Sequence, residues 1–356
     1  MTEEGRVAVI IPQSCVTNKT KIERQAKQRI LKRHTLEGVI TCNPNTFYGV
    51  GTHACIAIFT AGVPHPPEHE AKFIDFRDDG FVVRSHIGLI EGDTAKDKRQ
   101  HLLDVWNGLI ESSSEFCVSS TVLSTDEWLH SFYYYNDVVP EDELFEIAFG
   151  EFLSFQFSMI VQNRGYLFAS TPELNQHDIP KLSEKDWAEF PLNEVFSVKS
   201  GVRLTTADKV PGQRPFIGAS DNTNGVTGFV SNENASLDSN VLGVNYNGAP
   251  CIAFYHPYEA IFTDDVKRLK LLHHDNNALV LLFCKVVIMQ QRAKYSYGYK
   301  FNAGRMARQL LMFPVTDDGD IDYEYMEKYA ENMLLRKYRQ YSDYLASLLE
   351  TDAEED

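Results

Sequence analysis

The first third of the chain alternates short apolar runs with one amphipathic basic stretch. Residues 5–12, GRVAVIIP, form a near-continuous run rich in Val and Ile, which is typical of a buried central strand in a parallel sheet. Across residues 18–32, apolar positions recur at helical spacing among lysines and arginines, which predicts an amphipathic helix. Residues 39–42 and 54–59 favour two more strands, and residues 73–76 an edge strand or the start of a linker. This alternation predicts an open α/β sheet.

The next stretch has the weakest pattern. Helices are expected around residues 98–110 and 141–158, and strands near Phe81 and Phe116. Prolines and polar residues then mark a boundary into a second globular region.

That second region combines short strands with turns rich in Gly and Asn. The pattern predicts strands at residues 215–219, 241–246 and 251–255 and an apolar helix at residues 278–290, which together make a compact α+β unit. Residues 322–349 then carry apolar positions that alternate by four and three, as in one long helix with an apolar seam. The predicted domains are therefore residues 1–75, 76–185, 186–315 and 316–356.

Length and composition limit the class of protein. A chain of 356 residues with 43% hydrophobic content can bury more than one core, so we expect two or three domains. The sequence shows neither a membrane span nor a signal peptide, and we expect a cytoplasmic protein without a membrane partner. The cysteines are scattered and the histidines lack zinc spacing, so we expect reduced thiols and no metal site.

Two segments carry recognition chemistry. Residues 195–230 place amides, hydroxyls and two arginines on turns between short strands, where they offer forked donors and acceptors. Residues 294–305, KYSYGYKFNAGR, alternate cations with aromatic rings. The net charge of −16 argues against DNA, because phosphate neutralisation needs Lys and Arg. However, the acidic residues are concentrated in residues 63–185 and 316–356, whereas the remaining segments are mildly basic.

From Phe196 to Pro314 the chain resembles the target recognition domains of restriction-modification enzymes. These domains occur in the specificity subunits of type I systems and in single-chain type IIG enzymes. The resemblance is carried by Phe196, Pro215-Phe216-Ile217, the run from Gly243 to Tyr255, Tyr295-Ser296-Tyr297 and Leu310 to Pro314. It implies an α+β domain that binds double-stranded DNA.

The first segment resembles the closing third of an adenine-N6 DNA methyltransferase domain, in which a strand like GRVAVIIP follows the catalytic loop. The resemblance implies a partial Rossmann-like α/β remnant. No glycine-rich strand-to-helix turn precedes Gly5, and no Asn/Asp-Pro-Pro-Tyr/Phe motif occurs. The nearest match, Asn43-Pro44-Asn45-Thr46-Phe47-Tyr48, lacks the second proline and follows the wrong strand. We therefore expect no catalytic residue and no cofactor in this chain, with S-adenosylmethionine bound by the complete enzyme.

The same resemblance suggests two aromatic residues for contact with an extruded base. In that family the loop after the strand lies beside the pocket for the flipped adenine, and an aromatic ring there stacks on the base. Phe47 or Tyr48 would take this place, although packing on the sheet explains an aromatic there equally well.

Base and phosphate contacts follow from side-chain chemistry. Arginine can bond bidentately to guanine and asparagine to adenine, whereas lysine holds phosphates without reading sequence. The candidates for base contacts are Arg203, Arg214, Asn222 and Asn224, and Ser220 on the same stretch is a further candidate for DNA binding. The candidates for the backbone are Lys199, Lys294, Tyr297, Lys300 and Arg305. Turn formation is the competing explanation for the two asparagines.

Nuclease activity has weak support. Glu70-Ala71-Lys72 and Asp265-Val266-Lys267 match only the last element of a PD-(D/E)xK site.

Our leading hypothesis is a duplex-DNA recognition module that directs adenine-N6 methylation together with an N-terminal methyltransferase portion or subunit. Alone, the chain is expected to be inactive as an enzyme. The alternative is a protein-interaction subunit that docks on a methyltransferase partner without reading DNA, which the acidity of the connector and tail would favour.

Overall fold

The computed structural model describes residues 5–17, 20–168, 174–296 and 298–354, with side chains of the last helix as far as residue 343. The chain folds into two compact units, Met1–Tyr135 and Asn136–Asp356. The domain limits that the sequence predicts at residues 75, 185 and 315 therefore fall within units rather than between them.

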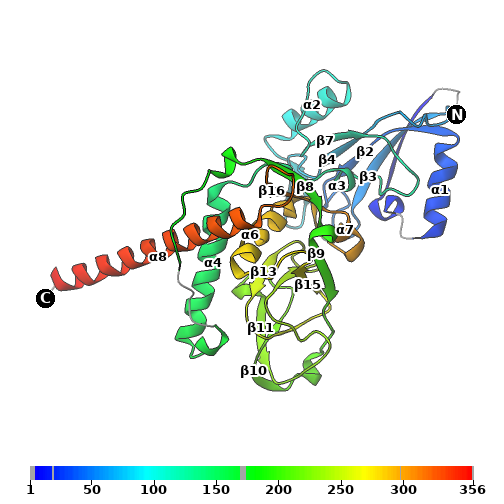
Figure 1. Cartoon of the computed structure of the whole chain (residues 1–356). Coiled ribbons are helices and arrows are strands. Elements are labelled where there is room, and N and C mark those ends of the chain that lie inside the picture. Colours follow the sequence, from blue (N-terminus) through cyan, green and yellow to red (C-terminus); the bar gives the residue numbers. More distant parts are fainter. Residues whose placement is uncertain (1–4, 18–19, 169–173, 297, 355–356) are drawn as a thin grey trace. The chain divides into compact units, whose positions relative to one another are not determined.

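Unit 1 is built on a five-stranded mixed sheet in the order β1-β3-β2-β4-β7 (Figure 1, blue to cyan). Its strands are β1 (Arg6–Pro12), β2 (His34–Cys42), β3 (Ala54–Ala61), β4 (Ala71–Phe76) and β7 (Cys117–Ser120). A separate hairpin is formed by β5 (Phe81–Arg84) and β6 (Gly88–Glu91). The helices are η1 (Gln13–Val16), α1 (Lys21–Leu31), α2 (Ala95–Trp106) and α3 (His130–Tyr133).

Strand β1 lies at the edge of this sheet and pairs antiparallel with β3. The expectation of a central strand in a parallel sheet is therefore wrong; the parallel pair in this sheet is β2 with β4. A continuous apolar run indicates burial on both faces, but it carries no information about the direction or number of neighbouring strands. Val9 and Ile10 remain 40% and 58% exposed, so this edge is apolar and uncovered by the described residues.

The basic helix predicted after β1 is present as α1. It begins with a capping box, in which Thr20 Oγ1 accepts from the Glu23 backbone N–H and the Glu23 carboxylate accepts from that of Thr20. Lys27 faces inward, donates to the Val16 carbonyl at 2.7 Å and lies 4.4 Å from the centre of the Trp128 ring. Burial lowers the pKa of Lys27 to about 7. This lysine ties the helix to its own unit.

Unit 2 contains a four-stranded antiparallel sheet, β13-β12-β15-β9, and a three-stranded sheet, β11-β10-β14. The strands are β8 (Trp187–Pro191), β9 (Phe196–Ser200), β10 (Pro211–Ile217), β11 (Val226–Val230), β12 (Val241–Asn245), β13 (Ala253–His256), β14 (Ile261–Phe262), β15 (Val266–Leu271) and β16 (Leu310–Pro314). The longer helices are α4 (Asp142–Val161), α6 (Ala278–Met289) and α8 (Tyr323–Glu354). The short ones are η2 (Gly165–Leu167), η3 (Leu182–Glu184), α5 (Leu192–Val195), η4 (Thr206–Asp208), η5 (Thr223–Gly225), η6 (Gln290–Lys294) and α7 (Ala303–Ala307).

The core of unit 2 surrounds α6. Nine consecutive residues of this helix, Val280–Ile288, are buried, and α4 and α8 pack against it. By length and composition alone α4 could cross a membrane, but its Phe145 and Phe149 are fully buried in this helical packing. A core helix of a soluble protein has the same composition.

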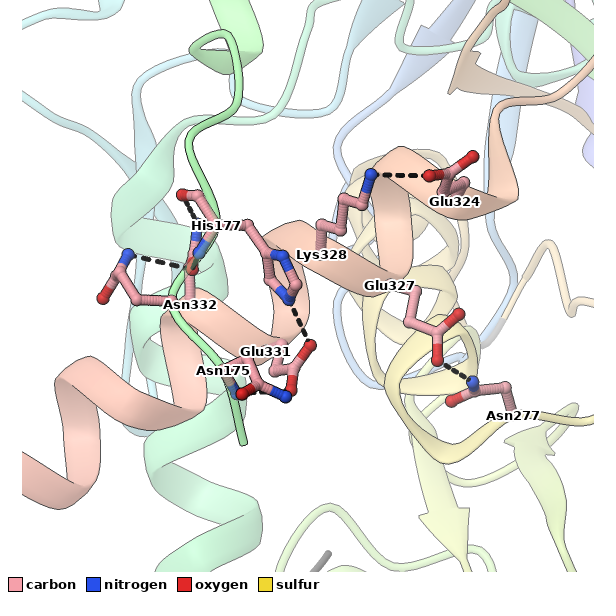
Figure 2. Close-up of polar contacts among 9 residues, drawn as sticks. Asn175, His177, Asn277, Glu324, Glu327, Lys328, Glu331 and Asn332 are labelled. Carbon is pink, nitrogen blue, oxygen red and sulfur yellow. Dashed lines mark hydrogen bonds and ion pairs between the residues drawn. The ribbon is translucent and has the colours of Figure 1, made fainter. Parts of the chain in front are cut away.

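The first half of α8 braces this unit (Figure 2). The Glu331 carboxylate accepts from the Asn175 backbone N–H at 2.6 Å and contacts the His177 ring at 2.5 Å. One turn nearer the start of the helix, Glu327 accepts from the side chain of Asn277, the residue that caps α6. The long helix predicted at residues 322–349 is therefore confirmed, and it holds together segments that are distant in sequence.

Candidate nucleic-acid interface

Two loops of unit 2 are joined where β9 ends. The Gly201 backbone N–H donates to the Val266 carbonyl at 3.1 Å, and the Val202 N–H donates to the Phe262 carbonyl at 2.8 Å. A Cβ atom on Gly201 would lie 1.9 Å from the Thr263 carbonyl oxygen, so only glycine permits this approach. The loop after β9 and the β14–β15 turn therefore form one surface.

Two further loops meet the same surface. The Asn245 side chain donates to the Ser220 carbonyl at 2.7 Å, which ties the β10–β11 loop to the end of β12. The Tyr246 backbone N–H donates to the Asp265 carbonyl at 2.9 Å, which ties that end to the β14–β15 turn. We call residues 199–203, 218–223, 246–248 and 263–267 the outer loop cluster.

The outer loop cluster brings together four of the residues predicted to contact DNA. Lys199 and Arg203 are exposed, and within the described parts of the chain neither side chain has a hydrogen-bond or ion-pair partner. Ser220 and Asn222 lie on the neighbouring loop, where the side-chain oxygen Oδ1 of Asn222 accepts from the hydroxyls of Ser220 and Thr223 at 3.1 and 3.2 Å. Asn222 therefore shapes its turn and still offers its exposed amide N–H₂ group to solvent.

Asn224 does not join this surface, and its predicted base contact does not fit the structure. It is 4% exposed, and its amide donates to the Tyr255 carbonyl at 2.9 Å and contacts the Tyr258 hydroxyl at 3.2 Å. Its φ of 50° is the left-handed conformation that asparagine adopts more readily than most residues. Its backbone suits a turn, but its side chain ties that turn to Tyr255 and Tyr258 rather than to neighbouring residues.

Arg214 is also occupied. Its side chain is 17% exposed: Nη2 forms ion pairs with Glu233 at 3.0 Å and Glu259 at 2.8 Å, Nε also donates to Glu259, and Nη1 donates to the Asn232 carbonyl at 2.7 Å. A bidentate contact with guanine needs two free donors. In this conformation Arg214 holds strands and loops of its own unit together.

The second predicted segment folds inward. Lys294 and Arg305, which the sequence predicts to hold phosphates, are each 6% exposed, so this structure leaves little of either side chain open to DNA. The Arg305 guanidinium lies 3.5 Å from the centre of the Tyr299 ring and donates to the Lys300 carbonyl at 2.8 Å. We call residues 290–309 the inner segment. Tyr297 lies outside the described residues.

Lys300 reaches the outer loop cluster from the inner segment. It is partly exposed, and its ammonium lies 6.0 Å from the centre of the Tyr246 ring. Tyr246 itself was missed by sequence reasoning, because a single tyrosine after an apolar strand has no distinguishing pattern. The alternation of charged and aromatic residues in 294–305 does not reveal which of these side chains are exposed.

In unit 1, Phe47 and Tyr48 are 45% and 49% exposed on the loop between β2 and β3. A Cβ atom on Gly88, in the β5–β6 hairpin, would lie 3.6 Å from the Tyr48 ring. The two rings are thus available to solvent rather than packed within the sheet.

The nuclease pattern is not supported by the geometry. Asp265 accepts from the side chain of Asn247 at 3.1 Å, and Lys267 donates to Ser200. Within the described residues, no group of three His, Cys, Asp or Glu side chains could hold a metal ion.

Two family descriptions match this chain. "Type I restriction modification DNA specificity domain" covers residues 184–340, and "N-6 DNA Methylase" covers residues 1–128. The chain is 45% identical over 235 residues to the type II restriction enzyme specificity subunit S.BcgI of Heyndrickxia coagulans, which is 66% of this chain and 67% of that protein. It is also 45% identical over 169 residues to the restriction enzyme and methyltransferase RM.BcgI of the same organism, 48% of this chain and 26% of that protein.

The stretches that match S.BcgI and RM.BcgI add up to more residues than the chain has, so part of the chain matches both proteins. Among solved structures, the S subunit of a type I restriction-modification system from M. genitalium is similar at 18% identity and a TM-score of 0.35, over 58% of this chain and 52% of that one. That agreement is too loose to assign a role to any residue.

Proposed function

The chain belongs to the family of type II restriction enzyme specificity subunits that includes S.BcgI, and we propose that its outer loop cluster reads a specific site in double-stranded DNA. In the assembled restriction-modification enzyme this recognition directs adenine-N6 methylation to the site. Four loops joined into one surface carry the proposal, because they present the Asn222 amide together with Lys199 and Arg203, whose side chains have no partner in the described chain.

These side chains suit the two kinds of contact that a DNA-reading surface needs. Arg203 is a forked donor that can bond to guanine O6 and N7, and the Asn222 amide can bond to adenine. Lys199 supplies a point charge for a phosphate, which sets register without reading sequence.

The methyltransferase partner completes unit 1 in this proposal. Strand β1 leaves one edge without a paired strand in the described residues, and its Val9 and Ile10 are exposed. Long apolar edges invite a further strand, and natural proteins otherwise protect them with charge, proline or a covering element. A strand from an N-terminal methyltransferase portion, in the same polypeptide or a separate subunit, would pair with this edge.

S-adenosylmethionine is the methyl donor implied by the match to an N-6 DNA methylase. The described part of unit 1 does not fit it. The sequence between β1 and α1, residues 13–20, contains neither a glycine nor an acidic residue, whereas a nucleotide-like cofactor needs close backbone approach after such a strand. The donor and the transfer step therefore belong to the partner.

Phe47 and Tyr48 extend the proposal to the target base. An adenine must leave the helix before its amino group can be methylated, and exposed rings beside the sheet can stack on the extruded base. The exposure of both side chains supports this role.

The decisive test uses this chain assembled with its methyltransferase partner. A pool of random duplexes is selected for binding, and the affinities of the selected site and of an unrelated duplex are then measured by gel shift. Arg203→Ala should weaken binding of the selected site by about 1–3 kcal/mol, roughly 5- to 150-fold, and leave the unrelated duplex nearly unaffected. Arg339→Ala, an exposed arginine on α8, serves as the matched control.

The competing function is docking on the methyltransferase without DNA readout. An apolar groove of about 550 Å³ between α4 and α8, with Phe157 and Tyr341 exposed beside it, favours some protein contact. If the assembly forms normally but selects no site, or if Arg203→Ala changes partner affinity and not DNA affinity, docking is the function of unit 2.

A further inference from the structure

Tyr246 belongs to the outer loop cluster, and two lysines from different segments lie near its ring. The Lys267 ammonium, from β15, lies 5.0 Å from the centre of the Tyr246 ring, and that of Lys300 lies 6.0 Å from it. Cations at such distances are attracted to the ring face, which restricts where two otherwise flexible side chains can lie. The tyrosine therefore brings two ammonium groups from different segments to one ring, with the carboxylates of Asp264 and Asp265 close to Lys267.

Within the described residues Lys267 forms no ion pair. Its ammonium donates to the Ser200 hydroxyl at 2.9 Å, a neutral partner. Burial lowers the pKa of Lys267, while the nearby carboxylates of Asp264 and Asp265 oppose that shift. Neither carboxylate lies within ion-pair distance among the described residues, and Asp265 is engaged by the Asn247 amide. A partly desolvated cation with a neutral partner is prepared to receive an anion.

Tyr246 adds a third donor. Its side chain is only partly exposed, and within the described chain its phenol hydroxyl makes no hydrogen bond. Its backbone is fixed by the N–H bond to the Asp265 carbonyl, and its neighbour Asn245 is fixed to Ser220. The position of the ring is thus set by the same contacts that join the recognition loops.

We propose that Lys267, Lys300 and Tyr246 form a clamp for one phosphate of the DNA backbone, next to the bases contacted by the outer loop cluster. The proposal rests on the DNA-reading function above and assigns part of that surface. Lysines are compact charges without the fork that distinguishes bases, so this clamp sets register and does not read sequence. The lysines should therefore raise the affinity for every duplex equally, whereas Arg203 should raise the affinity for the selected site alone.

Salt dependence provides the sharpest test. In the assembled enzyme, the affinities of the selected site and of an unrelated duplex are measured across a range of salt concentrations. Losing one phosphate contact should reduce the slope of log K against log salt by about 0.9. Lys267→Gln should show this reduction for both duplexes, and Lys267→Arg, which keeps the charge, should restore the slope. Lys328→Gln, on the exposed side of α8, is the matched control.

The tyrosine has its own pair of variants. Tyr246→Phe keeps the ring and loses the hydroxyl, so it should weaken both duplexes modestly and leave the slope intact. Tyr246→Leu loses the ring that positions the two ammonium groups and should weaken both duplexes further. Circular dichroism melting of each variant identifies any that fails to fold. If a tyrosine variant fails to fold, the comparison of Lys267→Gln with Lys267→Arg still tests the clamp.

Each outcome separates the clamp from the proposed function. If the wild-type assembly selects no DNA site, the function itself fails. If it selects a site but Lys267→Gln keeps the wild-type slope and affinity, only the clamp is overturned. A loss confined to the selected site would also overturn it, because that result indicates a base contact. Loss of a bound acidic protein with unchanged DNA affinity would assign these lysines to a protein partner instead.

Discussion

The outer loop cluster and the inner segment are both rich in cations, yet the chain uses those cations in opposite ways. In the outer loop cluster, Lys199 and Arg203 reach solvent without internal partners in the described chain. In the inner segment, Lys294 and Arg305 are buried and lie against the rings of Tyr295 and Tyr299. Alternating cations and aromatic rings therefore indicate cation–π packing inside a domain as readily as a nucleic-acid surface.

This difference predicts a division of labour within unit 2. Buried basic groups should control the free energy of unfolding, because removing them leaves carbonyls and rings without partners. Exposed basic groups should control DNA affinity and leave stability almost unchanged. The contrast fails if a buried group affects binding alone or if an exposed one is needed for folding.

The largest effect is expected from a buried histidine of the same unit. His256 is fully buried, and burial lowers its pKa from 6.5 to about 3. Between those pH values the unfolded chain binds a proton that the folded chain excludes. The contribution of His256 to the free energy of unfolding is therefore complete above pH 6.5, and several kcal/mol are lost as the pH falls toward 3. Urea unfolding at a series of pH values, followed by circular dichroism, measures this loss.

A matched pair of variants isolates the histidine from general acid effects. His256→Leu should flatten the dependence of unfolding free energy on pH in that window, although it also removes the contact with the Tyr258 hydroxyl. His273→Leu, at an exposed position, should leave the pH dependence as in the wild type. Equal pH profiles for all three proteins would show that His256 is not protonated on unfolding as argued.

The next effect concerns the inner segment directly. Arg305→Ala should lower the free energy of unfolding by about 2–4 kcal/mol, because the Lys300 carbonyl loses its donor and the Tyr299 ring loses its stacked guanidinium. Urea unfolding of the isolated chain gives the value. Arg292→Ala, an exposed arginine in the same segment, should change it by less than about 0.5 kcal/mol. A stable Arg305→Ala protein with impaired DNA binding would place this residue on the interface after all.

The positions of the main helices and strands follow from sequence because each pattern reports burial along one element. The amphipathic spacing after β1 predicts α1, and the long seam near the C-terminus predicts α8. The pairing of β1 does not follow, since an apolar run is compatible with a central or an edge position. The hydrophobic pattern of a helix or strand predicts which of its faces are buried, but not which elements pack or pair with it.

The candidate site is predictable only as a set of loops. Arg203 and Arg214 are equivalent in sequence, both on a turn-rich stretch, yet two carboxylates from distant positions, Glu233 and Glu259, engage only Arg214. Conversely, Tyr246 is a candidate for phosphate binding only because the fold brings Lys267 and Lys300 close to its ring. Tertiary partners decide whether a polar side chain is available, and no local pattern encodes them.

The smallest effect separates two asparagines that are two residues apart. Asn224→Ala removes the bonds to the Tyr255 carbonyl and Tyr258 hydroxyl and places alanine at a φ of 50°, so it should lower the free energy of unfolding by about 1–3 kcal/mol. Asn222→Ala removes an exposed amide, so its unfolding free energy should stay within about 0.5 kcal/mol of the wild type.

In the DNA assay Asn222→Ala should have the larger effect of the two variants, because only Asn222 offers an amide to a base. Its loss should cost at most about 1–3 kcal/mol of discrimination at one position of the selected site. Both variants are therefore measured by urea unfolding and by repeated site selection. If Asn222→Ala selects the same site with the same affinity, its amide serves the turn alone, and readout within the outer loop cluster depends on Arg203.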